Sequence, residues 1–518
     1  MKKTASILAG AMLSLGLMTG AQAATLKMAY DADPVSLDPH EQLSGGTLQL
    51  SHMTFDPLVR WTRDLGFEPR LAEKWERVDD LTMRFHLRKG VKFHSGNDFT
   101  AQDVAFTFER LRNSPDFKAV FSPFKEIKVV DAHTVDLVTN QPFPLVLNNA
   151  TYLFPMDSKF YSGTDENGNA KDMLVKHGNS FASRNISGTG PYTVSYREQG
   201  VKVEFARNMD YWDKSSPGNV DKIVLTPIKE APTRVAALLS GDVDFIAPVP
   251  PTDHKRIGGS DKVDLVTMGG TRIITFQMNQ ERVEAFKDVR VRQAIAYAIN
   301  QEGIVKKIMK GFATPAAQFS PKGYLGYNEA LTPRYDVKKA KQLMKEAGYE
   351  KGFSITMMAP NNRYVNDAKI AQAVASMLSK INIKVDLKTM PKAQYWPEFD
   401  ARAADMMLIG WHADTEDSNN FYEFLSTCPN KDSGAGQYNS GNYCNPKVDA
   451  MVAKANAETD PAKRAEIMQG IEKIIYDEAG FIPLHWQNLA WAANKNVDLE
   501  PVLNVMNFPY LGDLVVKD

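Results

Sequence analysis

The sequence predicts an α/β protein of more than one lobe that is exported from the cytoplasm. Its 518 residues suggest roughly three domains, at about 150 residues per domain. Segments with the alternating pattern of strands and segments with helical periodicity follow one another along the whole chain. The N-terminus carries all three parts of a secretory signal peptide.

The signal peptide is the first element. Lys2 and Lys3 precede an apolar run over 7–18, and the Ala-Gln-Ala pattern at 21–23 predicts cleavage before Ala24. The run is shorter than the ~20 residues that cross a membrane, so a cleaved leader is favoured over a membrane anchor. No cysteine follows the cleavage site, so a lipid has no acceptor there. We therefore expect a soluble protein in a bacterial periplasm.

Strands dominate the elements predicted next. A short strand runs into a turn over 25–36, and alternation over 81–88 predicts a half-buried strand. Thr100 begins a helix, because Asp103 stands at the capping-box position and apolar residues follow at helical spacing. Further strands are expected at 123–130, 134–139, 192–196, 201–207 and 222–227.

Helices and strands alternate in the second half of the chain. Strand 354–359, helix 366–380 and strand 383–390 form a βαβ pattern, which implies a parallel pair of strands. An apolar strand is expected at 481–486, and Gly348 ends one of the preceding helices. The helices are expected at 231–240, 289–299, 337–347, 447–457 and 461–478.

Composition and charge exclude several classes of protein. Apolar residues make up 43% and charged residues 24% of the chain, which is ordinary for a globular protein. Lys and Arg number 61 against 62 Asp and Glu, so no basic excess points to a nucleic-acid partner. The nine histidines are scattered without a pair at metal-ligand spacing. We predict no metal and no cofactor.

The two cysteines, Cys428 and Cys444, flank a segment rich in Gly, Asn and Ser. In an oxidising compartment a disulfide is expected to close this loop, although two separate thiols are the alternative. Neither cysteine belongs to a CxxC pair, so a redox role is not expected.

Catalytic motifs are missing from the sequence. It contains no GxSxG, no HExxH, no phosphate-binding GxxxxGK[ST] and no EF-hand loop. We therefore name no catalytic residue and predict that the protein is not an enzyme. An exported peptidase built from residues far apart in the chain is the alternative.

Five segments occur in an order that resembles the peptide-, nickel- and opine-binding family (family 5) of bacterial ABC-transporter substrate-binding proteins. Within the family, IGWHADTEDSNNFYEFLSTC at 409–428 is most similar to the periplasmic dipeptide-binding proteins. The five segments are LAEKW with MRFHLRKGVKFHSGNDFTAQDVAFTFERL (71–111), GTGPYTV with DYW (188–212), FKDVRVRQAIAYAIN with GFATPA (286–316), YDVKKAKQLMKEAGY (335–349) and GFIPLHW (480–486).

The resemblance implies two α/β lobes that close like a hinge over a cleft, together with an additional smaller α/β domain. Lobe I is expected to comprise 24–70, 186–275 and 485–518. The additional domain would span 71–185, and lobe II would span 276–484. Because the chain crosses between the lobes, the domains are discontinuous.

The resemblance also implies a function. We expect a solute receptor that captures short peptides, dipeptides in the first place, and delivers them to an inner-membrane ABC permease and its ATPase. The protein would act as a monomer. Longer peptides, glutathione, haem, chelated nickel and opines remain alternative ligands.

A free peptide needs one fixed anion and one fixed cation, because enclosing either of its end charges without compensation costs several kcal/mol. Asp414, in the turn after the strand MMLIGW, resembles the amine-binding aspartate of the family; it could instead cap its own turn. Arg363 resembles the carboxylate-binding arginine and could grip a carboxylate with two hydrogen bonds. Its alternative role is a surface pair with Asp367.

Two further segments are expected to line the cleft. Trp411 and His412 adjoin Asp414, and Trp411 could pack on the ligand or belong to the core. The other segment resembles the small-residue stretch that passes close to bound peptide in the family, and a plain turn is its alternative. It comprises Ser44, Gly45, Gly46 and Thr47.

Overall fold

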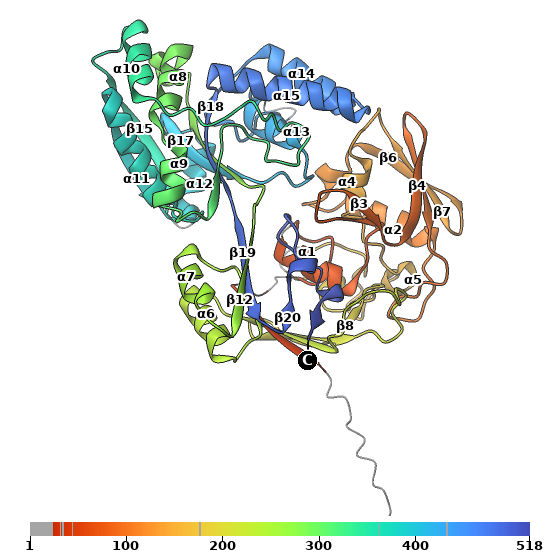
Figure 1. Ribbon diagram of the computed structural model, residues 1–518. Helices are drawn as coiled ribbons and strands as arrows, with labels where there is room; N and C mark the ends of the chain where they lie inside the picture. Colours follow the sequence, from red (N-terminus) through yellow and green to blue (C-terminus); the bar gives the residue numbers. More distant parts are fainter. Residues whose placement is uncertain are drawn as a thin grey trace, which may run out of the picture.

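The computed structural model (Figure 1) describes residues 24–517 except 32, 34–35, 44, 176–177, 362 and 431–433. The predicted signal peptide and Ser44 therefore lie outside the described residues. Among the described helices, none combines the length and the apolar character that crossing a membrane requires.

A seven-stranded sheet forms the lower part of the molecule in Figure 1. β1 pairs in parallel with β10 and β11, and the other pairs are antiparallel. Helices α6 (Ala231–Ser240) and α7 (His254–Gly258) flank it, and α6 ends at Gly241 in the left-handed conformation. The strand order is β12 (Val263–Met268), β19 (Leu489–Asn494), β11 (Phe245–Ala247), β1 (Thr25–Tyr30), β10 (Lys222–Pro227), β9 (Lys202–Arg207) and β8 (Tyr192–Glu198).

A six-stranded sheet forms the upper part, with helices on both faces (Figure 1). Helices α8 (Val289–Ala298), α10 (Val337–Glu346) and α11 (Asp367–Leu378) pack on one face. Helices α14 (Pro446–Ala457) and α15 (Pro461–Glu478) pack on the other. The strand order is β14 (Ala313–Pro315), β18 (Phe481–Gln487), β13 (Ile273–Met278), β17 (Met406–Trp411), β15 (Phe353–Pro360) and β16 (Ile383–Met390).

The predicted βαβ unit is confirmed in this sheet. β15 and β16 pair in parallel, and α11 connects them. The sequence analysis missed β13, whose six residues are all buried. Because both faces of the sheet are covered by helices, its polar residues Thr275 and Gln277 are buried as well, and the strand shows no alternation of buried and exposed positions.

A four-stranded antiparallel sheet forms a third layer, on the right of Figure 1. Its order is β4 (Ala72–Asp79), β5 (Thr82–Leu87), β7 (Thr134–Thr139) and β6 (Phe124–Asp131). Helix α2 (Ala101–Arg112) covers it, and the predicted capping box is present, with Thr100 N–H donating to the Asp103 carboxylate at 2.8 Å. The sequence analysis missed β4, whose side chains are mostly exposed.

The remaining elements connect these three layers. They are α1 (Gly45–Thr54), β2 (Val59–Trp61), β3 (Phe67–Pro69), α3 (Lys118–Phe121), α4 (Val146–Ala150), α5 (Ser158–Tyr161), α9 (Gln301–Lys307), α12 (Lys392–Asp400), α13 (Ser418–Phe421), β20 (Val497–Asp498) and β21 (Val515–Val516). The fold is the expected two-lobed α/β architecture with an additional α/β layer. The predicted limits of the three domains stay a prediction.

The chain crosses between the two large sheets along two neighbouring segments. One leads from β12 to β13 over 269–272, and the other leads from β18 to β19 at 488. The N–H of Gln487 donates to the carbonyl of Arg272 at 2.9 Å. A Cβ on Gly270 would lie 2.2 Å from the carbonyl oxygen of Gln487, so the two crossings touch backbone to backbone.

The predicted disulfide joins Cys428 to Cys444. The loop it closes is also held from inside, since the Asn439 side-chain amide donates to the carbonyls of Thr427 and Tyr443. The segment follows α13, so the disulfide stabilises the region just beyond the turn that carries Asp414.

Removing this disulfide is expected to lower the free energy of unfolding by about 3 kcal/mol, because the cross-link restricts a loop of about 15 residues in the unfolded chain. Denaturant unfolding of the Cys428→Ser, Cys444→Ser double variant against the native protein measures the change. Thiol titration of the unfolded, unreduced protein is the control. Two reactive thiols in that titration would contradict the pairing.

Candidate ligand-binding cleft

Asp414 lies in the turn that follows β17, where the six-stranded sheet faces the other layers. The hydroxyl of Tyr152 donates to its backbone carbonyl, and the side-chain amide of Asn148 donates to the carbonyl of Thr415 at 2.8 Å. Asn148 belongs to α4, and Tyr152 follows it. The turn is therefore tied through its backbone to α4 and the residues just after that helix.

The rest of the turn is fixed by charged partners. His412 contacts Glu416, with Nε2 and Oε1 3.1 Å apart, and its Nδ1 lies 2.9 Å from the hydroxyl of Thr271. Asp417 pairs with the buried Arg464, at 2.8 Å from Nη2 to Oδ1, and caps α13. This turn is rigid because each of these side chains has a partner.

The carboxylate of Asp414 has no such partner. Within the described part of the chain, no donor forms a hydrogen bond or ion pair with it, so capping of the turn is the role of Asp417 and not of Asp414. Burial raises the pKa of Asp414; His412 and Arg272 oppose this effect, and Glu416 adds to it. A half-buried anion that lacks a partner is suited to binding a cation.

Arg363 lies in the connection between β15 and α11 and is exposed. The Asp367 carboxylate accepts hydrogen bonds from the backbone N–H groups of Arg363 and Tyr364, at 2.9 and 3.0 Å. Among the described residues, Arg363 forms no side-chain ion pair with Asp367, which was the alternative left open by the sequence. The guanidinium carbon lies 5.1 Å from the Tyr364 ring centre.

Trp411 is half-buried, and its indole N–H donates to the Asn420 side chain at 2.8 Å. Its ring packs against Tyr438 and Phe424, with centres 4.6 and 5.4 Å away. One edge of this aromatic group faces a cavity, so Trp411 serves both the packing and the wall of the cleft.

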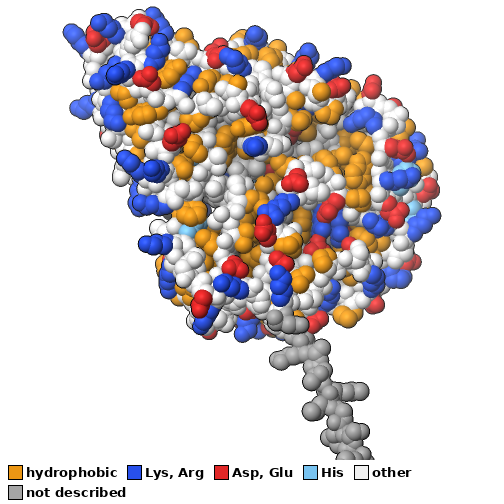
Figure 2. Space-filling view, viewed as in Figure 1, with side chains coloured by type: hydrophobic (Ala, Val, Ile, Leu, Met, Phe, Trp, Pro, Cys, Tyr) orange, Lys and Arg blue, Asp and Glu red, His pale blue; other side chains and the backbone are white. Residues whose placement is uncertain are grey.

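Two connected cavities form the cleft. The larger, of about 540 Å³, contains Arg363 and Trp411 in its wall. The smaller, of about 330 Å³, is lined mainly by apolar residues such as Phe312 and Phe508. Figure 2 shows hydrophobic side chains exposed along the hollow between the upper and lower parts. Both volumes fall in the range of small-ligand sites. The residues shared by the two walls are Leu43, Arg272, His412 and Asp414.

The small-residue segment is not the plain turn that the sequence left as the alternative to a cleft-lining role. Gly45, Gly46 and Thr47 form the first turn of α1, and Thr47 is buried. The neighbouring Leu43 and Leu48 line the smaller cavity instead. Local composition could not show this, because helix α1 is fixed by the packing of Leu50 and Met53 against the seven-stranded sheet rather than by its weak sequence pattern.

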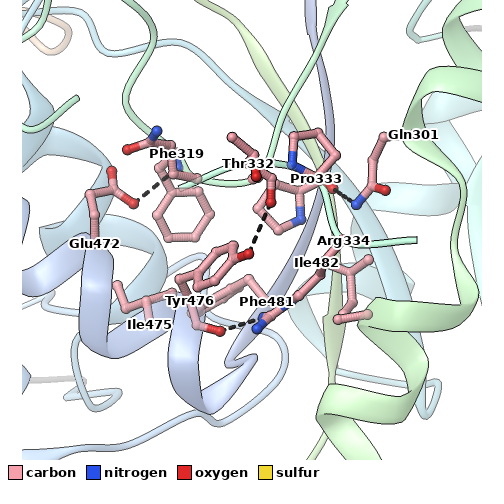
Figure 3. A pocket seen from close by; sticks show the side chains of 14 residues that line it. Gln301, Phe319, Thr332, Pro333, Arg334, Glu472, Ile475, Tyr476, Phe481 and Ile482 are labelled. Carbon is pink, nitrogen blue, oxygen red and sulfur yellow. Dashed lines mark hydrogen bonds between the residues drawn. The ribbon is translucent and has the colours of Figure 1, made fainter. Parts of the chain in front are cut away.

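A third hollow lies inside the upper lobe, between α15 and β18 (Figure 3). Glu472 accepts hydrogen bonds from the N–H groups of Phe319 and Ser320 beside it, at 3.1 and 2.8 Å. Its volume of about 20 Å³ is enough for about one water molecule. A peptide cannot enter, so this hollow is a packing feature.

Known proteins resemble this chain along nearly its whole length. The family model described as "Bacterial extracellular solute-binding proteins, family 5 Middle" matches residues 66–433. The chain belongs to this family. The dipeptide-binding protein of Escherichia coli (strain K12) is 30% identical, with 90% of each chain covered. The glutathione-binding protein GsiB of Salmonella choleraesuis (strain SC-B67) is 28% identical, over 91% of this chain and 90% of that protein.

A solved structure agrees with this family 5 assignment. It is the "ABC transporter-associated periplasmic binding protein DppA from Helicobacter pylori in complex with peptide STSA". The two chains share 26% identity and a TM-score of 0.75, and the match covers 95% of this chain and 98% of that one. The family and these neighbours are binding proteins.

Sequence reasoning missed three residues of the cleft in this solute-binding protein. Arg272 lines both cavities, and Asn148 and Tyr152 hold the turn of Asp414 from α4. The one signal available was that this arginine directly precedes the segment IITFQM, which forms β13. The chain positions of Asn148 and Tyr152 give no hint of the contact.

Replacing Asp414 by Asn is expected to raise the melting temperature of the ligand-free protein. Folding raises the pKa of this carboxyl, so its ionised form opposes folding at neutral pH, and the opposition disappears as the pH falls through the raised pKa. The amide keeps the shape without the charge. Thermal unfolding from pH 4 to pH 8 measures the difference, which should shrink toward the acid end.

Asp417→Asn is the matched control, because it makes the same chemical change three residues away. It leaves the buried Arg464 without its partner and should cost about 3–5 kcal/mol. A fall in stability for Asp414→Asn similar to that of the control would contradict our account of Asp414.

Proposed function

We propose that this protein is a periplasmic receptor that captures short peptides and delivers them to an inner-membrane ABC permease and its ATPase. It is exported by the cleavable leader over 1–23, acts as a monomer, and catalyses no reaction. The observation that carries the proposal is the half-buried, unpartnered Asp414 carboxylate in a cleft between the lobes of a family 5 solute-binding protein.

The chemistry of a free peptide fits this cleft. Asp414 binds the peptide's ammonium, and the exposed guanidinium of Arg363, in the wall of the same cavity, binds the carboxylate. The apolar wall of the smaller cavity receives a side chain. Trp411 and His412 lie beside Asp414 and complete the wall around the amine end.

Closure of the cleft is expected to depend on contacts with the turn of Asp414. Tyr152 and Asn148 bind two carbonyls of that turn from α4, on the other side of the cleft. These hydrogen bonds involve the backbone, so they do not depend on which peptide is bound. A ligand that touches both sides adds to them and shifts the population toward the closed form.

A receptor for glutathione is the second candidate, because the glutathione-binding protein GsiB is almost as similar to this chain as the dipeptide-binding protein is. Glutathione carries an ammonium as well, so it would use Asp414 in the same way. Native mass spectrometry of the purified protein, searching for a ligand that co-purifies, separates the two candidates.

Asp414→Asn is expected to weaken dipeptide binding by roughly 200- to 5,000-fold, since breaking one side of a buried charge pair costs about 3–5 kcal/mol. Acetylating the peptide's amine should have the same effect, and the two changes together should cost no more than either alone. Replacing Arg363 by Gln and amidating the peptide's carboxylate form the parallel cycle for the other end of the peptide. Calorimetry measures all the affinities.

Arg112→Gln, at an exposed arginine of α2, is the neutral control for these cycles. Independent, additive losses from Asp414→Asn and acetylation would show that Asp414 is not the partner of the amine. If no unmodified dipeptide binds while another solute does, the protein is a receptor for another class of ligand.

Saturating peptide is expected to reduce the radius of gyration measured by small-angle scattering, because the lobes close on the ligand. An unchanged radius at full occupancy would contradict closure.

Tyr152→Phe should weaken binding by about 2- to 12-fold, the range for loss of one neutral hydrogen bond. Tyr192→Phe is its matched control, since that hydroxyl also donates to a backbone carbonyl, at 2.8 Å, but inside lobe I.

A further inference from the structure

The half-buried Arg272 differs from the buried arginines in the described part of the chain. Its one hydrogen bond is long, at 3.5 Å from Nη1 to the carbonyl of Gly410, and it forms no ion pair there. The others have carboxylates or several backbone carbonyls as partners. They are Arg70 with Asp56, Arg110 with Asp38, Arg464 with Asp417, and Arg234 and Arg292 with carbonyls.

The free donors of Arg272 face the ligand site. Its half-buried side chain lines both cavities. Its backbone carbonyl accepts a hydrogen bond from Gln487 of the second crossing segment, which fixes the base of the side chain. A guanidinium has five donors in a planar fork, and most of those of Arg272 remain available to a ligand.

Arg272 lines the larger cavity together with Asp414 and Arg363, the two residues proposed to bind the ends of a peptide. Burial lowers the pKa of Arg272; Arg363 adds to this effect, and Tyr364 and Asp414 oppose it. The charges that act on Asp414 are those of His412, Arg272 and Glu416. Arg272 and Asp414 therefore lie close enough for their charges to interact, yet their side chains form no ion pair within 4.0 Å.

A plain dipeptide leaves this charge without a partner. Its ammonium on Asp414 would lie near a second cation, and its carboxylate would be bound by Arg363. Asp400 also lines the larger cavity, but it is exposed, and an exposed charge compensates little. With a dipeptide bound, the positive charges of Arg272, Arg363 and the ammonium face only two negative charges, those of Asp414 and the peptide carboxylate.

We propose that Arg272 is a further ligand-binding residue, which binds a carboxylate on the first residue of a peptide whose ammonium lies on Asp414. The inference rests on the proposed function and narrows it to ligands with one ammonium and two carboxylates. The extra carboxylate can be an acidic side chain at the first position. It can also be the α-carboxylate of a first residue that is linked through its side chain.

Four peptides test this assignment by calorimetry: Asn-Leu, Asp-Leu, Glu-Leu and the β-linked isomer of Asp-Leu. At least one of the three acidic peptides should bind about 10- to 100-fold more tightly than Asn-Leu, the gain expected from a charged hydrogen-bonded pair. The peptide that gains most identifies the source of the carboxylate. Asn-Leu has the shape of Asp-Leu without its side-chain charge, so the ratio isolates that charge.

Arg272→Gln should abolish the ratio between acidic and neutral peptides. Arg363→Gln, the matched control, should weaken all four peptides by a common factor and leave the ratio intact. Arg272→Lys should retain only part of the ratio, because an ammonium lacks the planar fork. Should Arg272→Gln fail to fold, a ratio undiminished in Arg272→Lys would overturn the proposal.

Equal binding of all four peptides by the native protein, or a ratio that survives Arg272→Gln, would overturn the role of Arg272 and leave the peptide receptor standing. Failure of the native protein to bind any of the four or Ala-Leu would instead overturn the proposed function. The two failures are therefore distinguishable in one set of titrations.

Discussion

The cost of keeping charges away from water without a partner is the constraint that organises this molecule. In the lobes and the additional layer, that cost is avoided by pairing: Arg110 Nη1 lies 2.8 Å from Asp38, and Arg464 Nη2 lies 2.8 Å from Asp417. Among the residues of the cleft that the structure describes, Asp414 and Arg272 are the exceptions. A ligand with complementary charges removes the cost, so the same interactions that oppose the empty state favour the bound state.

This arrangement requires rigid surroundings, because a flexible turn would let the unpaired carboxylate move toward water or a neighbouring cation. The pairs on His412, Glu416 and Asp417 fix the turn around Asp414. The two crossing segments fix the base of Arg272 through its carbonyl. Each part of the site therefore keeps its own geometry, which is what the proposed closure of the lobes on a ligand requires.

The motifs that mark the family are largely structural in this chain. A Cβ on Gly188 would lie 2.0 Å from the carbonyl oxygen of Thr54, so GTGP is required for close packing against the end of α1. Trp212, in the DYW segment, donates to Asp56 at 2.8 Å, and Arg70 pairs with the same carboxylate. These contacts hold the segments 54–70 and 188–212 together, and none of these residues lines either cavity of the cleft.

The sequence alone determined what depends on neighbours along the chain. The capping box of Thr100 and Asp103, the βαβ unit of β15 and β16, and the single cysteine pair could all be predicted, because each is encoded in a short pattern or has one possible partner. Only the tertiary structure brought Arg272 and Tyr152 to Asp414 and placed 45–47 in a helix. The physical reason is that a charge is paired or unpaired according to long-range packing, which no local pattern records.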